Sequence, residues 1–383
     1  MGAQKTVLIL GGGIGGHVAA NILGSRLKGR HRVVLVDKQK DFVFSPSFLW
    51  LMLGKRRPQD IQRPLSALGR KWVELREAQV LKIDPSSKAV ETSAGILTCD
   101  YLLIALGADL APEKVPGFNE AAINLYTLEG AQRIRQSLEG FAGGKVVVFI
   151  SSSPFKCPAA PYEAAFLIHD FLKSRNIKAQ VEVYTPEPYP MPTAGQKIGE
   201  ALKGMLESVG IPVRTQHKVI AIDSASKVIS FENGAKTGFD LLLGVPPHQA
   251  TGAARDSGLA GDSGWIPVDP HTLATKHDGI YALGDAAGVC IAAGKALPKA
   301  GVFAYHQARV VAGNILAQLD GKAPEARFDG RGWCIIETGS GRAAFGGGNF
   351  YAPEGPKLKL HSPARHWHWA KVLLEKWWLR RWF

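Results

Sequence analysis

The chain has 383 residues, of which 46% are hydrophobic and 43 are glycine, and its formal net charge is +13. This composition excludes a disordered chain and is typical of a globular protein with two or three domains. The positive charge favours anionic partners, such as an anionic membrane surface, a nucleic acid or a small anion. Because the cationic residues are scattered and form no recognition motif, we expect no nucleic-acid partner.

The first predicted unit consists of a strand, a glycine-rich turn, a helix and a second strand. The first strand, over 6–10, runs into the GxGxxG glycines Gly11, Gly13 and Gly16. The second strand ends at Asp37, 21 residues after Gly16. Glycine in such a turn lets the backbone approach a pyrophosphate, and an acid at that spacing binds ribose hydroxyls. The unit therefore predicts a dinucleotide site, and the alternative is a tight turn without a ligand.

A second unit of the same kind follows a buried strand over 100–108, which contains Gly107, and a connector with a helix within 113–142. Its own strand, over 145–150, is followed by three serines instead of glycines and then by Cys157. Without glycine the backbone cannot approach a pyrophosphate in the usual way. We therefore expect that this unit does not bind a nicotinamide dinucleotide.

Two strand–turn–helix units predict an α/β fold with two Rossmann-like domains. The later elements agree with that fold because helices and strands continue to alternate. In chain order they are a helix over about 159–174, a strand over 181–185, a proline-broken loop over 187–192, a helix over 197–210, a strand over 240–247, a strand and turn over 279–286, and a helix over about 301–319.

Four cysteines occur, and none belongs to a CxxC motif. The sequence therefore predicts no zinc ribbon, no thioredoxin-like motif and no metal site. We expect no signal peptide and no spanning helix, because the N-terminus lacks a charged and apolar leader and no apolar run reaches about 18 residues. In the cytoplasm, a cysteine pair is more often redox-active than structural. We expect Cys99 in the core and assign no role to Cys290.

In their order these blocks resemble the two-dinucleotide-binding-domain flavoproteins. Four shorter stretches are similar to the sulfide:quinone oxidoreductase and flavocytochrome c sulfide dehydrogenase branch of that group, namely 42–47, 156–163, 297–301 and 332–334. The resemblance implies a disulfide reductase-like FAD/NAD(P)-binding fold with FAD as cofactor. The FAD-contacting positions that it implies are Gly11, Gly13, Gly16, Asp37, Lys38, Pro46, Val80, Gly107, Gly284, Asp285 and Lys299.

The same resemblance implies a redox pair, Cys157 and Cys334, which would face each other across the flavin and hold sulfur between them. Two unrelated buried cysteines are the alternative, since cysteine often acts as a small hydrophobe. Glu163 is a candidate proton carrier, although an acid at a helix start also stabilises that terminus. No cysteine stands near Ser45, where flavocytochrome c members bond the flavin, so we expect non-covalent FAD.

The C-terminal tail, residues 361–383, holds five of the nine tryptophans. Tryptophan with flanking cations is typical of an anchor at the membrane interface. At helical spacing one face carries Ala370, Leu373, Leu374, Trp377 and Trp378, and the other carries Val372 and Leu379. The resemblance implies a quinone site at Lys371 and Leu374. The alternatives are a helix packed on the domain and a dimer contact.

The resemblance as a whole implies a sulfide:quinone oxidoreductase, which oxidises sulfide to sulfur or polysulfide and reduces ubiquinone or menaquinone. We expect a peripheral protein on the cytoplasmic side of the inner or plasma membrane, which could form a homo-oligomer. The alternatives are a type II NADH:quinone oxidoreductase, a flavocytochrome c-type flavoprotein and a non-catalytic flavin-binding scaffold. The predicted domains are an FAD-binding domain in two parts (1–112 and 240–320), a degenerate second Rossmann-like domain (113–239) and a C-terminal redox-cysteine and quinone or membrane segment (321–383).

Overall fold

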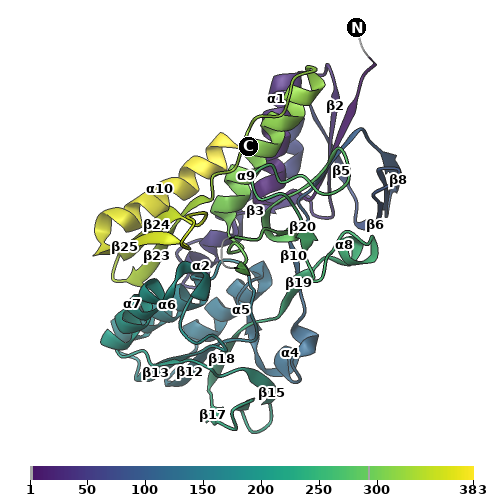
Figure 1. Ribbon diagram of the computed structural model, residues 1–383. Coiled ribbons are helices and arrows are strands. Elements are labelled where there is room, and N and C mark those ends of the chain that lie inside the picture. Colours follow the sequence, from purple (N-terminus) through teal and green to yellow (C-terminus); the bar gives the residue numbers. More distant parts are fainter. Residues whose placement is uncertain (1–2, 292–293) are drawn as a thin grey trace.

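The computed structural model describes residues 3–291 and 294–383, and its two lobes are built on two parallel five-stranded sheets (Figure 1). The first sheet has the order β21-β9-β1-β2-β5, formed by Ile280–Ala282, Tyr101–Ile104, Thr6–Leu10, Arg32–Asp37 and Val73–Glu77. The second has the order β11-β18-β12-β13-β14, formed by Ile123–Asn124, Leu241–Val245, Gly144–Ile150, Ala179–Tyr184 and Val213–Arg214. The α/β fold with two parallel sheets is thus the one that the sequence predicts.

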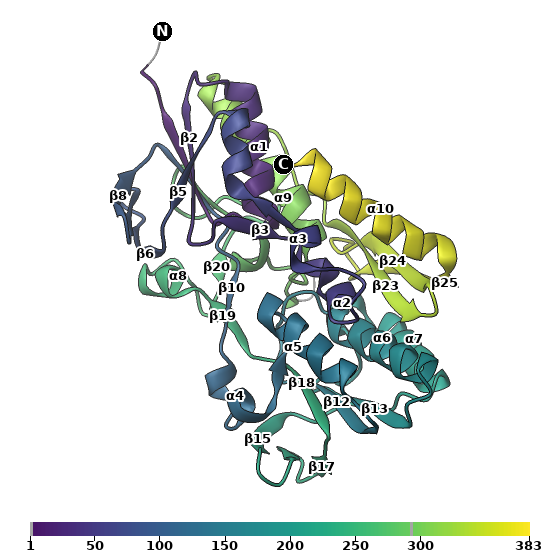
Figure 2. The same cartoon turned by 180° about the vertical axis from the view of Figure 1, so that it is seen from behind.

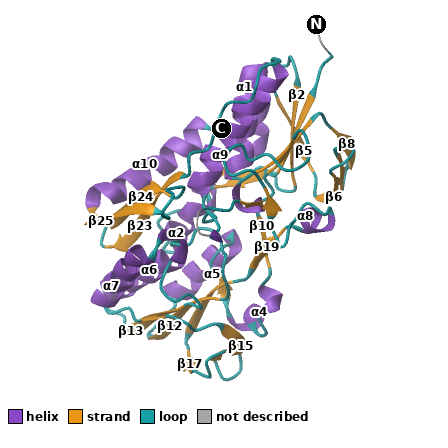
Figure 3. Ribbon diagram, viewed as in Figure 1, coloured by secondary structure: helices purple, strands orange, loops and turns teal. Residues whose placement is uncertain are grey.

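The central strands are continuous apolar runs because both faces of each sheet are covered. In β12 the side chains alternate between two cores, with Val146 and Val148 in one and Val147 and Phe149 in the other. The main helices lie beside these sheets (Figure 3). They are α1 (Ile14–Leu27) and α9 (Gly301–Leu319), which pack together on the first lobe, and α5 (Leu128–Glu139), α6 (Ala160–Ser174) and α7 (Gln196–Ser208) on the second.

Two short antiparallel strands carry the chain between the lobes. β10 (Ala108–Leu110) leads out of the first lobe and pairs with β19 (His248–Ala250), which leads back. The predicted domain boundary at 240 is therefore wrong, because β18 lies in the second sheet between β11 and β12. The reason is physical: Leu241–Val245 is an apolar run that is buried on both faces when it pairs with β12.

The C-terminal part is a three-stranded antiparallel sheet with one long helix on it. The sheet consists of β23 (Arg331–Gly339), β24 (Arg342–Asn349) and β25 (Lys357–Ala364), and the helix is α10 (Arg365–Arg381). Figure 2 shows α10 lying along this sheet and extending towards α1 of the first lobe. None of the helices within 3–291 and 294–383 is both long and apolar enough to cross a bilayer.

The buried face of α10 differs from the predicted apolar face. Val372 and Leu379 are buried, whereas Leu373 and Trp377 are exposed. Polar contacts decide this orientation, because the buried side also carries Glu375, which forms an ion pair with Arg56 at 2.8 Å. The spacing of apolar residues in the sequence does not reveal such an ion pair.

The remaining elements are short and complete the lobes. They are β3 (Asp41–Val43), α2 (Phe48–Leu51), α3 (Pro58–Ile61), β4 (Gln62–Pro64), β6 (Val80–Asp84), β7 (Ala89–Thr92), β8 (Gly95–Thr98), α4 (Phe118–Ala121), β15 (Val219–Asp223), β16 (Val228–Phe231), β17 (Lys236–Gly238), α8 (Gly252–Asp256), β20 (Ile266–Pro267) and β22 (Ala287–Gly288). In the described part of the chain, 3-10 turns lie between them at 45–47, 65–71, 112–114, 192–194 and 284–286.

Candidate active site

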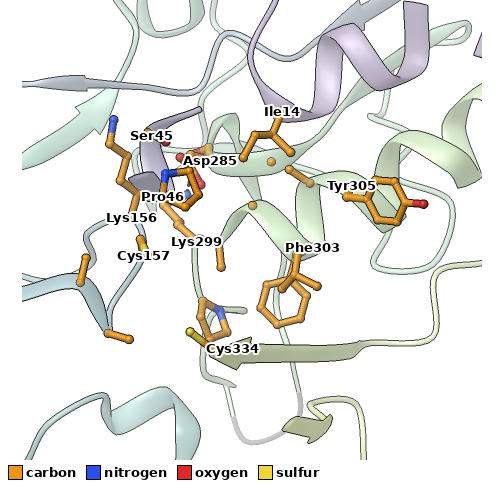
Figure 4. A pocket seen from close by; sticks show the side chains of 18 of the residues that line it. Ile14, Ser45, Pro46, Lys156, Cys157, Asp285, Lys299, Phe303, Tyr305 and Cys334 are labelled. Atoms are coloured by element: carbon orange, nitrogen blue, oxygen red, sulfur yellow. Dashed lines mark hydrogen bonds between the residues drawn. The ribbon is translucent and has the colours of Figure 1, made fainter. Parts of the chain in front are cut away.

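One cavity of about 800 Å³ runs between the two lobes and the C-terminal sheet. Most of the residues that the sequence singles out line it, including both predicted redox cysteines (Figure 4). The lining members of that set are Gly11, Gly13, Asp37, Lys38, Pro46, Gly107, Cys157, Glu163, Gly284, Asp285, Lys299, Cys334, Lys371 and Leu374. The exceptions are Gly16 and Val80.

The glycine-rich turn forms one end of the cavity. Gly11 has φ +96°, and a Cβ there would lie 2.4 Å from the carbonyl oxygen of Ala105. A Cβ on Gly13, the N-cap residue of α1, would meet no atom within 4 Å, so this glycine faces open space. Within 3–291 and 294–383, no side chain caps this helix terminus. Its backbone N–H groups are therefore available to a pyrophosphate.

Gly16 and Val80 do not touch the cavity. A Cβ on Gly16 would lie 1.8 Å from the carbonyl oxygen of Gly11, so Gly16 is needed for the close packing of α1 on the turn. Val80 starts β6 and packs against the core of the first lobe. The expectation that these two residues contact a cofactor is thus not supported by their position, and Gly16 acts through the shape of the turn instead.

Asp37 ends β2 at the edge of the cavity. Its carboxylate accepts hydrogen bonds from the N–H groups of Gly12, at 2.6 Å, and Gln39, at 2.7 Å. Two backbone donors hold the carboxylate in place, and Asp37 lines the cavity. This arrangement suits the binding of two ribose hydroxyls.

Lys299 forms a buried cationic corner of the cavity. Its Nζ donates to the carbonyl oxygens of Asp285, at 2.7 Å, and Ala287, at 3.3 Å, and lies 3.4 Å from the centre of the Trp265 ring. Burial lowers the pKa of Lys299 to about 8, although Asp285 acts in the opposite direction. The lysine is thus positioned to act as a hydrogen-bond donor. A nearby anion would raise its pKa and favour its charged form.

Cys157 is held by its backbone. Its N–H donates to the carbonyl oxygen of Lys299 at 2.6 Å, and its carbonyl oxygen accepts from the hydroxyl of Tyr126 at 3.1 Å. Its φ is +49°, which is uncommon for a residue with a side chain. These two hydrogen bonds keep the residue in that conformation, and the side chain lines the cavity.

Cys334 lies in β23, opposite Gly346 of β24, and lines the same cavity. Cys157 and Cys334 are 177 positions apart in the sequence, and Figure 4 shows them on separate segments that line the same pocket. All four cysteines carry free thiols, and Cys290 is exposed. Burial and then the negative charge of Glu163 raise the pKa of Cys157 to about 12, and they raise the pKa of Cys334 as well. Both thiols are therefore protonated at neutral pH in this state.

An ion pair lies beside the cysteines. Glu163 of α6 pairs with Lys371 of α10, and its carboxylate also accepts the N–H of Glu337 at 2.8 Å. Burial alone would lower the pKa of Lys371, but the carboxylates of Glu163 and Glu337 outweigh it and raise that pKa. The lysine therefore stays cationic at the cavity wall.

Two residues of this region are absent from the sequence-based predictions. Glu337 is buried in β23, and its carboxylate contacts Nδ1 of His368, at 2.9 Å. The only sequence signal for Glu337 is an acid directly after the apolar pair Ile335 and Ile336. His368 carries no signal that separates it from the other histidines of the tail, because its partner is far away in the sequence.

The second nucleotide-type turn is closed by its own side chains. Glu187, in the loop after β13, is buried and accepts hydrogen bonds from the hydroxyls of Ser153, at 3.1 Å, and Tyr162, at 3.0 Å. The N–H of Met191 also donates to it, at 3.3 Å. An acid after the second strand of a Rossmann unit usually binds a ribose hydroxyl. Here the carboxylate of Glu187 accepts hydrogen bonds from the protein itself instead.

Known proteins resemble the chain in sequence and fold. Residues 5–308 match the model of the pyridine nucleotide-disulphide oxidoreductase family. Over 354 residues the chain is 24% identical to the mitochondrial sulfide:quinone oxidoreductase of Mus musculus, covering 88% of this chain and 76% of that protein. Over 338 residues it is 27% identical to the demethylphylloquinone reductase NdbB of Synechocystis, covering 84% and 81%.

The solved structure of the sulfide:quinone oxidoreductase from Aquifex aeolicus has the same fold, with a TM-score of 0.87 at 24% identity. The match covers 99% of this chain and 91% of that chain. The two lobes, the cavity between them and the long family match agree with one another. The chain belongs to the pyridine nucleotide-disulphide oxidoreductase family.

Proposed function

We propose that the protein is an FAD-dependent sulfide:quinone oxidoreductase that acts through Cys157 and Cys334. One observation carries this proposal: two cysteines 177 positions apart line the cavity that also contains the glycine-rich nucleotide turn. Two unrelated core cysteines have no reason to share a cavity with a nucleotide turn. The sulfide:quinone oxidoreductases of Mus musculus and Aquifex aeolicus, which the chain resembles, support the same function.

The residues at the nucleotide end fit FAD. The uncapped α1 terminus would hold the pyrophosphate, Asp37 would hold the adenosine ribose, and Lys299 would lie beside the flavin. Bound FAD would accept two electrons from sulfur and pass them to quinone. The chain offers no cysteine near Ser45, so the cofactor is proposed to be non-covalent.

The cysteines would perform the sulfur step in their oxidised form. Hydrosulfide attacks a Cys157–Cys334 disulfide, a new S–S bond forms, and the old one breaks to leave a persulfide and a thiolate. We place the persulfide on Cys157 and the thiolate on Cys334. Removal of two electrons then rejoins the cysteines through the bound sulfur atom. The net positive charge of the chain favours the approach of hydrosulfide.

Quinone is proposed to bind at the end of the cavity formed by α10. Lys371 and Leu374 line that end, and the cationic Lys371 would stabilise negative charge on a quinone carbonyl oxygen. Nearby, Trp369, Leu373 and Trp377 form an exposed stripe at intervals of four residues. Exposed tryptophans beside cations are typical of a surface that lies in a membrane interface. The protein is thus proposed to be peripheral to a membrane.

The rival function is that of an NAD(P)H-dependent quinone reductase. Against it stand the serines after β12 and the internal hydrogen bonds of Glu187, which leave no usual pyrophosphate and ribose site on the second lobe. The distinction is testable with the purified holoenzyme under anaerobic conditions. Sulfide should bleach the flavin absorbance within seconds, and NADH at micromolar concentration should not. Fast bleaching by NADH, without bleaching by sulfide, would replace the proposed function by its rival.

A further inference from the structure

A set of four ionisable side chains lies at the wall of the cavity next to Cys334. They come from three elements: Glu163 from α6, Glu337 from β23, and Lys371 and His368 from α10. They form two contacting pairs, Glu163 with Lys371 and the Glu337 carboxylate with His368 Nδ1 at 2.9 Å. The pairs adjoin, because Glu163 accepts the backbone N–H of Glu337 and the Glu337 carboxylate acts electrostatically on Lys371.

The set leads from the cavity towards the surface. Glu163 and Lys371 line the cavity, whereas Glu337 and His368 do not. The side chains of Glu163 and Glu337 are 2% and 1% exposed, that of Lys371 is 11% exposed and that of His368 is 19% exposed. The imidazole is thus the member that solvent reaches from outside, and Trp50 of α2 covers one side of it.

The charges of the set favour one additional proton. Two carboxylates face one ammonium, so the buried groups carry a net negative charge unless the imidazole or one carboxyl is protonated. A buried charge without a partner is unfavourable, which favours binding of one more proton. Burial raises the pKa of Glu337, which is consistent with a proton held at the Glu337–His368 end. Arg56 does not supply the missing charge, because it pairs with Glu375.

The proposed reaction needs such a proton. Hydrosulfide brings one proton and loses two electrons, whereas quinone takes up two electrons and two protons to become quinol. The balance is HS⁻ + H⁺ + quinone → sulfur atom + quinol. One proton must therefore come from solvent to the quinone end of the cavity.

We propose that Glu337 and His368 continue from Lys371 and Glu163 as a proton path between solvent and the quinone end of the cavity. His368 takes a proton from water and passes it to the carboxylate of Glu337. The proton then crosses from this carboxylate to the adjoining Glu163–Lys371 pair, which presents it to the quinone oxygen. This inference rests on the proposed function, and it adds two residues that act through Lys371 rather than on the substrate directly.

The test separates the two half-reactions in the full-length holoenzyme. His368→Ala and Glu337→Gln should leave reduction of the flavin by sulfide within about twofold, and should slow reoxidation by a water-soluble short-chain quinone by about tenfold or more. The defect should grow as pH rises, because free protons become scarcer. Added imidazole should restore reoxidation in His368→Ala in a concentration-dependent manner. A purely structural role of His368 would not give that rescue.

His366→Gln is the matched control, because His366 is an exposed histidine of the same helix, two positions earlier. It should behave as the wild type in both half-reactions. If His368→Ala reoxidises at the wild-type rate, or if imidazole does not restore a lost rate, the path is wrong. If Glu337→Gln fails to fold, His368→Ala and its rescue decide the matter alone. A wild type that sulfide does not reduce would instead overturn the proposed function.

Discussion

At the scale of single residues, the cysteine pair carries the proposed chemistry. Burial raises the pKa of Cys157 to about 12, so the thiol is a poor nucleophile in the reduced state at neutral pH. In the proposed mechanism the attacking group is therefore hydrosulfide, and the cysteines are oxidised when it arrives. This distinguishes the site from that of a thiol enzyme, which depends on a lowered cysteine pKa.

Replacement of either cysteine should abolish the reaction without loss of the cofactor. Cys157→Ser and Cys334→Ser should each reduce sulfide-dependent quinone reduction by at least about a thousandfold, because neither leaves a disulfide to attack. The FAD content per chain, read from the absorbance after heat release, should stay near that of the wild type. Cys99→Ser is the control, because Cys99 packs against the core of the first lobe, outside the cavity. Retention of most activity in either active-site variant would refute the paired mechanism.

At the scale of elements, the end of α10 is tied to α1, the helix that begins at the nucleotide turn. Trp378 Nε1 donates to Nε2 of His17 at 3.2 Å, and Asn21 donates to the carbonyl oxygen of Trp382 at 2.8 Å. Because an indole only donates, Nε2 of His17 must be unprotonated, and Nδ1 carries the hydrogen that is donated to the carbonyl oxygen of Gly13 at 2.7 Å. The tail helix thus contacts His17, which in turn donates to Gly13, the N-cap residue of α1.

This contact should make the docking of α10 sensitive to acid. Burial lowers the pKa of His17 to about 4 from an ordinary value of 6.5, so the unfolded chain binds the proton first as pH falls. Stability should therefore be lost from pH 6.5 downward, by about 2 kcal/mol at pH 5. His17→Gln, which can accept from Trp378 but cannot titrate, should lack this loss. The free energy of unfolding of both proteins at pH 7 and pH 5 gives the comparison, and an equal fall in both would contradict it.

At the scale of the whole molecule, the exposed stripe of α10 and the net charge of +13 act together. In the proposed membrane attachment, the stripe would offer apolar side chains to the bilayer, and the same helix carries the exposed cations Arg365, Lys376, Arg380 and Arg381. Each cation near an anionic surface contributes about 1 kcal/mol, and salt screens that part. The quinone end of the cavity would then open next to the bilayer that holds the quinone.

The stripe should determine vesicle binding. Trp369→Ser combined with Leu373→Ser should weaken co-sedimentation with vesicles of anionic lipid by about tenfold or more, because both side chains would leave the interface. Reduction of the flavin by sulfide should be unchanged, since neither residue lines the cavity. Trp72→Ser with Leu81→Ser removes two exposed apolar side chains of the first lobe and should bind as the wild type does. Equal binding of all three proteins, without salt dependence, would show that the tail does not attach the protein.

The sequence by itself determined the features that depend on neighbouring residues. The turn at Gly11, the acid at Asp37 and the helix over 301–319 follow from local backbone geometry and apolar periodicity. These features can therefore be predicted from the sequence alone. The family and the α/β fold follow from their order. The domain boundary near 240 was wrong because a buried strand gives no sign of which sheet it enters.

Only the tertiary structure decided which distant residues meet. Cys157 and Cys334 share a wall because β23 crosses beside α6, and no spacing in the chain encodes that contact. The buried face of α10 depends on the ion pair between Glu375 and Arg56. The role proposed for His368 depends on its contact with the Glu337 carboxylate. A buried charge is stable only when a group of opposite charge lies next to it in space. Which residues become such neighbours depends on the folded structure and on the loss of water around them.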